Sequence, residues 1–106
     1  MEVIISNKQD LTDVAGELFA IKLHAKKSGG DLFASQRKLQ VKLYAGGKEY
    51  QSSNIITVEA GKTESVECSF NGNSTVQAVL LDAVTQEQVD KVSINKSNLR
   101  DLGGLI

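Results

Sequence analysis

Two side chains of this sequence belong to the types that most often carry catalysis or bind metals, and they lie far apart along the chain. His24 is the single histidine and Cys68 the single cysteine. A histidine acts as a general base only beside a nucleophile and an orienting acid, and the sequence contains no Gly-x-Ser-x-Gly or comparable motif. One histidine and one cysteine at this separation also lack the spacing of zinc ligands. We therefore expect no enzymatic activity, no cofactor, no metal site and a surface position for His24.

Cys68 alternates with Val66 and Phe70, and the residues between them are polar. This period of two predicts a strand with one buried face, on which Cys68 points inward. A buried cysteine is usually an inert, small apolar side chain, because a reactive thiol needs exposure and an electropositive neighbour. With a single cysteine, no intramolecular disulfide can form.

Three carboxylates flank one predicted turn and offer oxygen atoms of the kind that calcium binds. They are Asp82, Glu87 and Asp90. Their spacing does not match the regular Asp-x-Asn-x-Asp-Gly loop of calcium sites. We expect them to be solvated carboxylates at the ends of strands.

Size and charge restrict the partners that the chain can have. A length of 106 residues is that of one domain, and the net charge of −1 provides no basic surface for nucleic acid or for an anionic membrane. The first residues lack the basic and apolar regions of a signal peptide. Two locations remain open: the cytoplasm or a virion, and secretion after removal of a signal.

Short runs rich in apolar residues, separated by turn residues, dominate the chain and predict strands. They cover residues 2–6, 18–25, 38–44, 48–51, 55–59, 63–70, 74–82 and 89–94. Strands at intervals of about 8–12 residues, without a convincing helix, indicate an all-β antiparallel sandwich or barrel. We expect this domain to span residues 1–98, with residues 99–106 as a C-terminal tail.

The dipeptide Asn71-Gly72 separates two of these runs and predicts a hairpin that joins residues 63–70 to residues 74–82. The second run carries Val79 and Leu81 on its otherwise polar face. Its far end is therefore expected to be covered on both sides, as a central strand is.

The inward-facing positions of the predicted strands form the expected core. This set consists of Phe19, Ile21, Leu23, Leu39, Val41, Leu43, Ile56, Val58, Val66, Cys68, Phe70, Val76, Ala78, Leu80, Val92 and Ile94.

Residues 39–94 resemble bacterial immunoglobulin-like modules of the CARDB or fibronectin-III-like kind. The likeness rests on the alternating strand Leu39–Leu43, the glycine turn Gly46-Gly47 and the dipeptide Ala60-Gly61 before the next strand. It covers about half of the chain, which lacks the tryptophan of such cores and has no proline. The resemblance implies a single immunoglobulin-like antiparallel β-sandwich of seven to nine strands and an adhesion, spacer or accessory role. It does not identify any functional residue in this chain.

Two apolar segments outside the strand pattern are candidate partner-binding sites. Leu32 and Phe33 form an apolar pair in a polar connection, and Leu102, Leu105 and Ile106 recur in the tail. The pair either tucks under the sandwich or anchors a partner. The tail either packs on its own domain, adds to the sheet edge of a neighbour or frays.

The leading hypothesis is a non-enzymatic interaction or structural module that binds a protein partner, or a second copy of itself, through loops or an edge strand. A carbohydrate partner is also compatible with this hypothesis. One alternative is a small ligand-binding or hydrolytic protein with a concealed cleft. Another is a structural component of a phage or a secretion apparatus.

Overall fold

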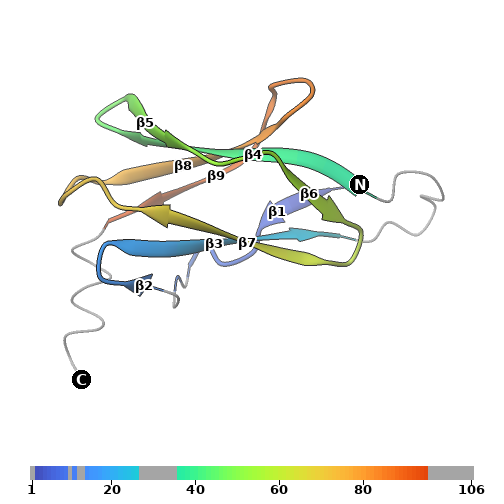
Figure 1. Cartoon of the computed structure of the whole chain (residues 1–106), viewed down its shortest axis with the longest axis horizontal. Helices are drawn as coiled ribbons and strands as arrows, with labels where there is room; N and C mark the ends of the chain where they lie inside the picture. The colour runs from blue at the N-terminus through green and yellow to red at the C-terminus, as the bar shows by residue number, and fades with distance from the viewer. Residues whose placement is uncertain (1, 10, 12–13, 27–35, 96–106) are drawn as a thin grey trace.

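In the computed structural model of the chain, the described residues form nine strands in two antiparallel sheets that pack face to face (Figure 1). The structure describes residues 2–9, 11, 14–26 and 36–95. Figure 1 shows β4, β5, β8 and β9 in one layer and β2, β3 and β7 in the other. Within the described ranges, no helix is long and apolar enough to span a membrane.

The four-stranded sheet, called sheet A here, is arranged around β3. This strand pairs with β7 along one edge and with both β1 and β2 along the other. The bounds are β1 (Val3–Ile5), β2 (Val14–Ala15), β3 (Leu18–Ala25) and β7 (Thr63–Ser69).

The five-stranded sheet, called sheet B here, is arranged around β4. This strand pairs with β8 along one edge and with both β5 and β6 along the other, and β9 pairs with β8. The bounds are β4 (Gln36–Ala45), β5 (Lys48–Ser52), β6 (Ile56–Glu59), β8 (Val76–Asp82) and β9 (Gln88–Ile94).

The distribution of strands between the sheets is that of an immunoglobulin-like sandwich. The first, third and seventh strands share one sheet, while the fourth, eighth and ninth are neighbours in the other. The prediction of an all-β, antiparallel, immunoglobulin-like sandwich of seven to nine strands is confirmed. Strand β2 was not expected from the sequence, since it is only two residues long.

The predicted hairpin at Asn71-Gly72 is wrong, because β7 and β8 belong to different sheets. The N–H of Phe70 donates to the carbonyl of Glu17 at 2.9 Å and extends the ladder between β7 and β3. The chain then turns at Gly72, with φ of 58°, and crosses to sheet B. Two strands that face each other across a sandwich show the same alternation as two strands of a hairpin, so the sequence period does not separate the two arrangements.

The core lies between the sheets and matches the predicted inward set closely. Fifteen of its sixteen residues are buried, and the remaining one, Ile56, is partly buried against them. On the outer face of β8, Val79 is buried, with 9% of its surface exposed, whereas Leu81 is only partly buried, so the expected cover on both sides is met in part. The rings of Phe19 and Phe70 pack with centroids 4.6 Å apart.

Candidate functional site

The two side chains with catalytic potential are held apart on opposite faces of sheet A. Cys68 points into the core with 3% of its surface exposed, as expected. Burial, with a smaller contribution from the charge of Glu67, raises the pKa of its thiol to about 12. His24 is half-buried on the outer face, where its Nδ1 lies 2.9 Å from Oγ1 of Thr63. No group of three or more histidine, cysteine or acidic residues in the described ranges is arranged to hold a metal ion.

Asp82 is a buried structural carboxylate, so the expectation that it is solvated is wrong. Only 8% of its surface is exposed. It accepts hydrogen bonds from the N–H groups of Val84 and Thr85, at 2.8 and 2.9 Å, and from Nε of Arg37 at 2.9 Å. The bond from Thr85, followed by those from Arg37 and Val84, lowers the pKa of Asp82 to about 2. These hydrogen bonds replace those to water that the carboxylate loses on burial.

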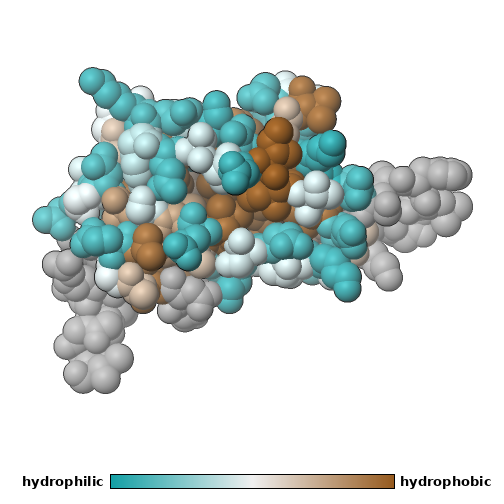
Figure 2. Space-filling view, in the orientation of Figure 1, coloured by the Kyte–Doolittle hydropathy of each residue, from teal (hydrophilic) through white to brown (hydrophobic). Residues whose placement is uncertain are grey.

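The turn that Asp82 organises presents an apolar side chain to solvent. Val84 lies in this β8–β9 turn with 78% of its surface exposed, and Ile55 before β6 is 61% exposed. Figure 2 shows apolar surface over the tip of the turn and over the start of β6. Because the exposed large apolar residues of the described ranges lie on separate elements, they do not by themselves indicate a binding site.

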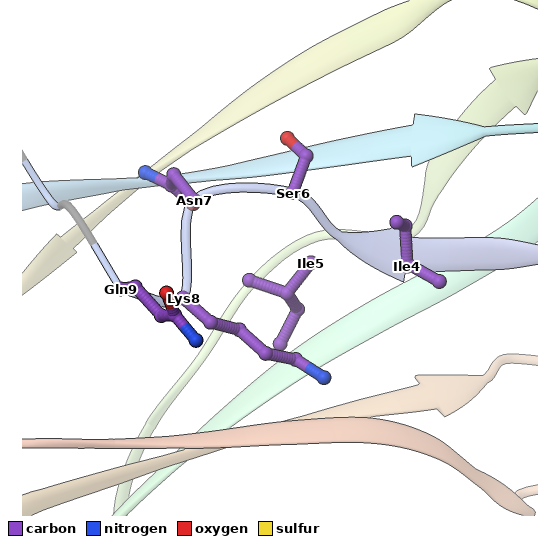
Figure 3. Close-up of a pocket in the computed structure, with 6 residues that line it drawn as sticks. All are labelled: Ile4, Ile5, Ser6, Asn7, Lys8 and Gln9. Carbon is purple, nitrogen blue, oxygen red and sulfur yellow. The ribbon is translucent and has the colours of Figure 1, made fainter.

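A shallow depression is lined by six consecutive residues, Ile4 to Gln9 (Figure 3). Three of its four polar side chains, those of Ser6, Asn7 and Lys8, form hydrogen bonds within the protein. The amide of Asn7 accepts a bond from the N–H of Lys22 and donates one to the carbonyl of Ala20, both at 3.0 Å. This side chain therefore bonds to the backbone of β3 in the interval between β1 and β2, where no described strand residue does so. Figure 3 shows Ser6 and Asn7 directed away from the side to which Ile5 and Lys8 point. The depression therefore lacks the convergent polar groups that a ligand site needs.

One open side of the sandwich is closed by Asp90, the second carboxylate that proves to be structural. Its Oδ2 accepts the N–H of Ile5, and its Oδ1 accepts the N–H of Lys91, both at 2.9 Å. Lys8 also donates to this carboxylate. Burial raises the pKa of Asp90, but the bonds from Lys8, Ile5 and Lys91 outweigh this effect and hold the pKa below its ordinary value.

The opposite side is closed at Ser69, the last residue of β7. The hydroxyl of Tyr50 donates to the carbonyl of Ser69 at 2.7 Å. Oε1 of Gln51 accepts the N–H of Ser69 at 3.2 Å and its hydroxyl at 2.7 Å. Two side chains of β5 thus occupy the position that a neighbouring strand would take beside Ser69.

Among the described residues, none pairs with the remainder of the β7 edge, which is called the open edge here. Antiparallel pairs alternate between residues that exchange backbone hydrogen bonds and residues that do not. The N–H of Ala25 donates to the carbonyl of Lys62, and the unbroken register from there to Phe70 directs the backbone of even-numbered residues toward β3. The backbone groups of Thr63, Ser65 and Glu67 therefore point outward. All three residues are exposed, and no described side chain hydrogen-bonds to these groups.

The predicted partner-binding residues Leu32, Phe33, Leu102, Leu105 and Ile106 lie outside the described residues, as does the predicted tail, residues 99–106. The open edge of β7 was missed because the predicted hairpin would have paired this strand with residues 74–82. Its only sequence signal is the polar run of Thr63, Ser65 and Glu67 on one face of the strand.

Comparison with protein families, with curated proteins and with solved structures gave no match to this chain.

Proposed function

We propose that the chain is a non-enzymatic interaction module, of the bacterial immunoglobulin-like kind, that binds an extended segment of a protein partner at the open edge of β7. The observation that carries the proposal is the contrast along this edge. The backbone of Ser69 is hydrogen-bonded by Tyr50 and Gln51, whereas the three outward-facing positions before it are exposed and have no hydrogen-bond partner in the described ranges. Unpaired backbone groups on an edge strand are a template for strand addition.

Two further features support a binding role over catalysis or capture of a small ligand. His24 and Cys68 are separated by the thickness of sheet A, with the thiol buried. At the depression of residues 4–9, the side chains of Ser6, Asn7 and Lys8 are hydrogen-bonded within the protein.

The proposal is tested by selecting binders from a displayed library of random linear peptides and measuring their affinity for two variants. Ser65→Pro removes the central outward N–H and places a ring at the edge, without removing a bond to β3. Ser65→Thr keeps the N–H and is the matched control. We expect the selected peptides to bind wild type and Ser65→Thr alike and to lose at least about tenfold in affinity for Ser65→Pro.

Equal affinity of every selected peptide for Ser65→Pro and wild type would overturn the proposal. Circular dichroism and the unfolding midpoint establish that the variant is folded. Thr63→Pro, at the start of the same strand, provides a second block of the edge should Ser65→Pro fail to fold.

A further inference from the structure

The open edge of β7 carries negative charge on both faces of the strand. Glu64 and Glu67 are exposed, and their separation of three residues places their side chains on opposite faces. Glu67 lies opposite Ala20 of β3, and Glu64 lies opposite Leu23, so neither has a basic residue directly across the ladder. Neither glutamate forms an ion pair with a described residue.

These charges disfavour a second copy of the chain as the occupant of the edge. A symmetric antiparallel pair that uses the three open positions is centred on Ser65, and it sets Glu64 of each copy opposite Val66 of the other. The two Glu64 side chains would then lie diagonally on one face, about 7–8 Å apart. Like charges on neighbouring strands repel, most strongly where they lie directly opposite, and this diagonal pair is close enough to disfavour the dimer.

An added strand of opposite charge removes this repulsion. We infer that the β7 edge binds an extended peptide whose basic residues lie three positions apart, one opposite Glu67 and one opposite Glu64. This inference rests on the proposed function and adds the chemistry of the partner. The backbone pattern makes the position opposite Glu64 a non-hydrogen-bonded pair, in which side chains approach more closely.

The positions between the two basic residues are also specified. The peptide residue opposite Val66 faces the gap between the sheets, where Val66 is 6% exposed and borders the core. An apolar side chain extends the core there. The next residue lies opposite Ser65, whose other neighbour is Lys22 of β3, so a basic residue is unfavourable at that position. The resulting pattern is basic, apolar, non-basic, basic.

The test uses a capped heptapeptide with lysine at its second and fifth residues, valine at its third, and serine or threonine elsewhere. Fluorescence anisotropy gives its affinity for the full chain. A peptide of identical composition, with the second lysine moved from the fifth residue to the fourth, is the matched control. We expect the control to bind up to about fivefold more weakly, the range for one cross-strand ion pair.

Two backbone substitutions test the orientation of the peptide. Methylation of the fourth nitrogen removes the N–H that would donate to Ser65, and we expect a loss of at least about tenfold. Methylation of the fifth nitrogen modifies an N–H that points away from β7, and we expect little change. The double variant Glu64→Lys, Glu67→Lys should instead prefer the peptide with glutamates in place of both lysines.

The outcomes separate this inference from the proposed function. If the two lysine arrangements bind equally while Ser65→Pro abolishes both, the edge binds strands but the charge pattern is wrong. If Ser65→Pro leaves binding unchanged, both proposals fail. If light scattering shows a dimer of the wild-type chain that Ser65→Pro dissociates, the occupant is a second copy and the inference of a basic peptide is overturned.

Discussion

The carboxylate of Asp90 accepts the backbone N–H of Ile5 at 2.9 Å and so joins the edge strand of one sheet to the edge strand of the other. Tyr50 and Gln51 do the same at Ser69 on the opposite side of the sandwich. Side chains thus satisfy selected backbone groups along the open sides of the fold. The part of β7 that lacks such a side chain is the part to which we assign binding.

Removal of the Asp90 carboxylate should destabilise the protein. Asp90→Ala leaves the N–H of Ile5 and the ammonium of Lys8 without their partner, and we expect a loss of about 1–3 kcal/mol in the free energy of unfolding. Glu49→Ala is the control, because Glu49 pairs with Lys42 at the surface and such pairs contribute little. Urea denaturation measures both variants, and equal effects would contradict the assigned role of Asp90.

The contribution of Asp90 should depend on pH in a defined direction. Its pKa is lower in the folded protein than in the unfolded chain, so the ionised carboxylate favours folding. This stabilisation is complete above about pH 4, the ordinary range of an aspartate, and is lost as the pH falls through the folded pKa. The stability difference between wild type and Asp90→Ala should therefore shrink on acidification below pH 4, and a difference that grows would contradict this account.

Gln86 has a left-handed backbone conformation, with φ of 65°, and is the single non-glycine residue of the described ranges with positive φ. Glycine adopts this conformation without the steric cost that glutamine bears. We expect Gln86→Gly to raise the free energy of unfolding by about 0.5–1 kcal/mol, after the entropy cost of glycine. Gln88→Gly, in the neighbouring strand, should lower it by about 0.5–1 kcal/mol. Destabilisation by both substitutions would show that the turn gains nothing from glycine.

Phe70 closes one end of the core against Phe19 and is 7% exposed. Phe70→Ala should cost about 3–5 kcal/mol of stability, since it leaves a cavity and removes an aromatic contact. Leu18→Ala, at a position that is 42% exposed, should cost much less. An unchanged denaturation midpoint for Phe70→Ala would place Phe70 outside the core.

The thiol of Cys68 should be unreactive in the folded protein. Its burial and its pKa of about 12 keep it protonated and inaccessible at neutral pH. A maleimide reagent should label it only after denaturation, whereas a cysteine introduced by Ser65→Cys on the exposed face should be labelled rapidly in native buffer. Fast native labelling of wild type would contradict the strand register between Val66 and Phe70.

The alternation of residues predicted the fold class and the core because burial on one face of a strand depends on local sequence. Leu39, Val41 and Leu43 are buried wherever their strand lies in a sandwich. The same alternation does not determine which strand pairs with which. Val66, Cys68 and Phe70 fit a hairpin with β8 and a ladder with β3 equally well, and only long-range packing selects the ladder.

The structural carboxylates were missed for a related reason. Asp82 and Asp90 resemble ordinary turn carboxylates in the sequence, and their hydrogen bonds involve Arg37 and Ile5, which are distant along the chain. The open edge of β7 likewise follows from the arrangement of the sheets. The edge is free of β8 because β7 and β8 belong to different sheets.

The most direct test of the central claim is amide hydrogen exchange at single residues of β7, measured by NMR with and without the lysine heptapeptide. In the free protein, we expect Ser65 and Glu67 to exchange fast, while Val66, Cys68 and Ser69 are protected by β3 or by Gln51. With peptide bound, Ser65 and Glu67 should become protected and the others should change little. Protection of Ser65 and Glu67 in the free monomer, or their continued fast exchange when peptide is bound, would contradict the assignment of β7 as a strand-binding edge.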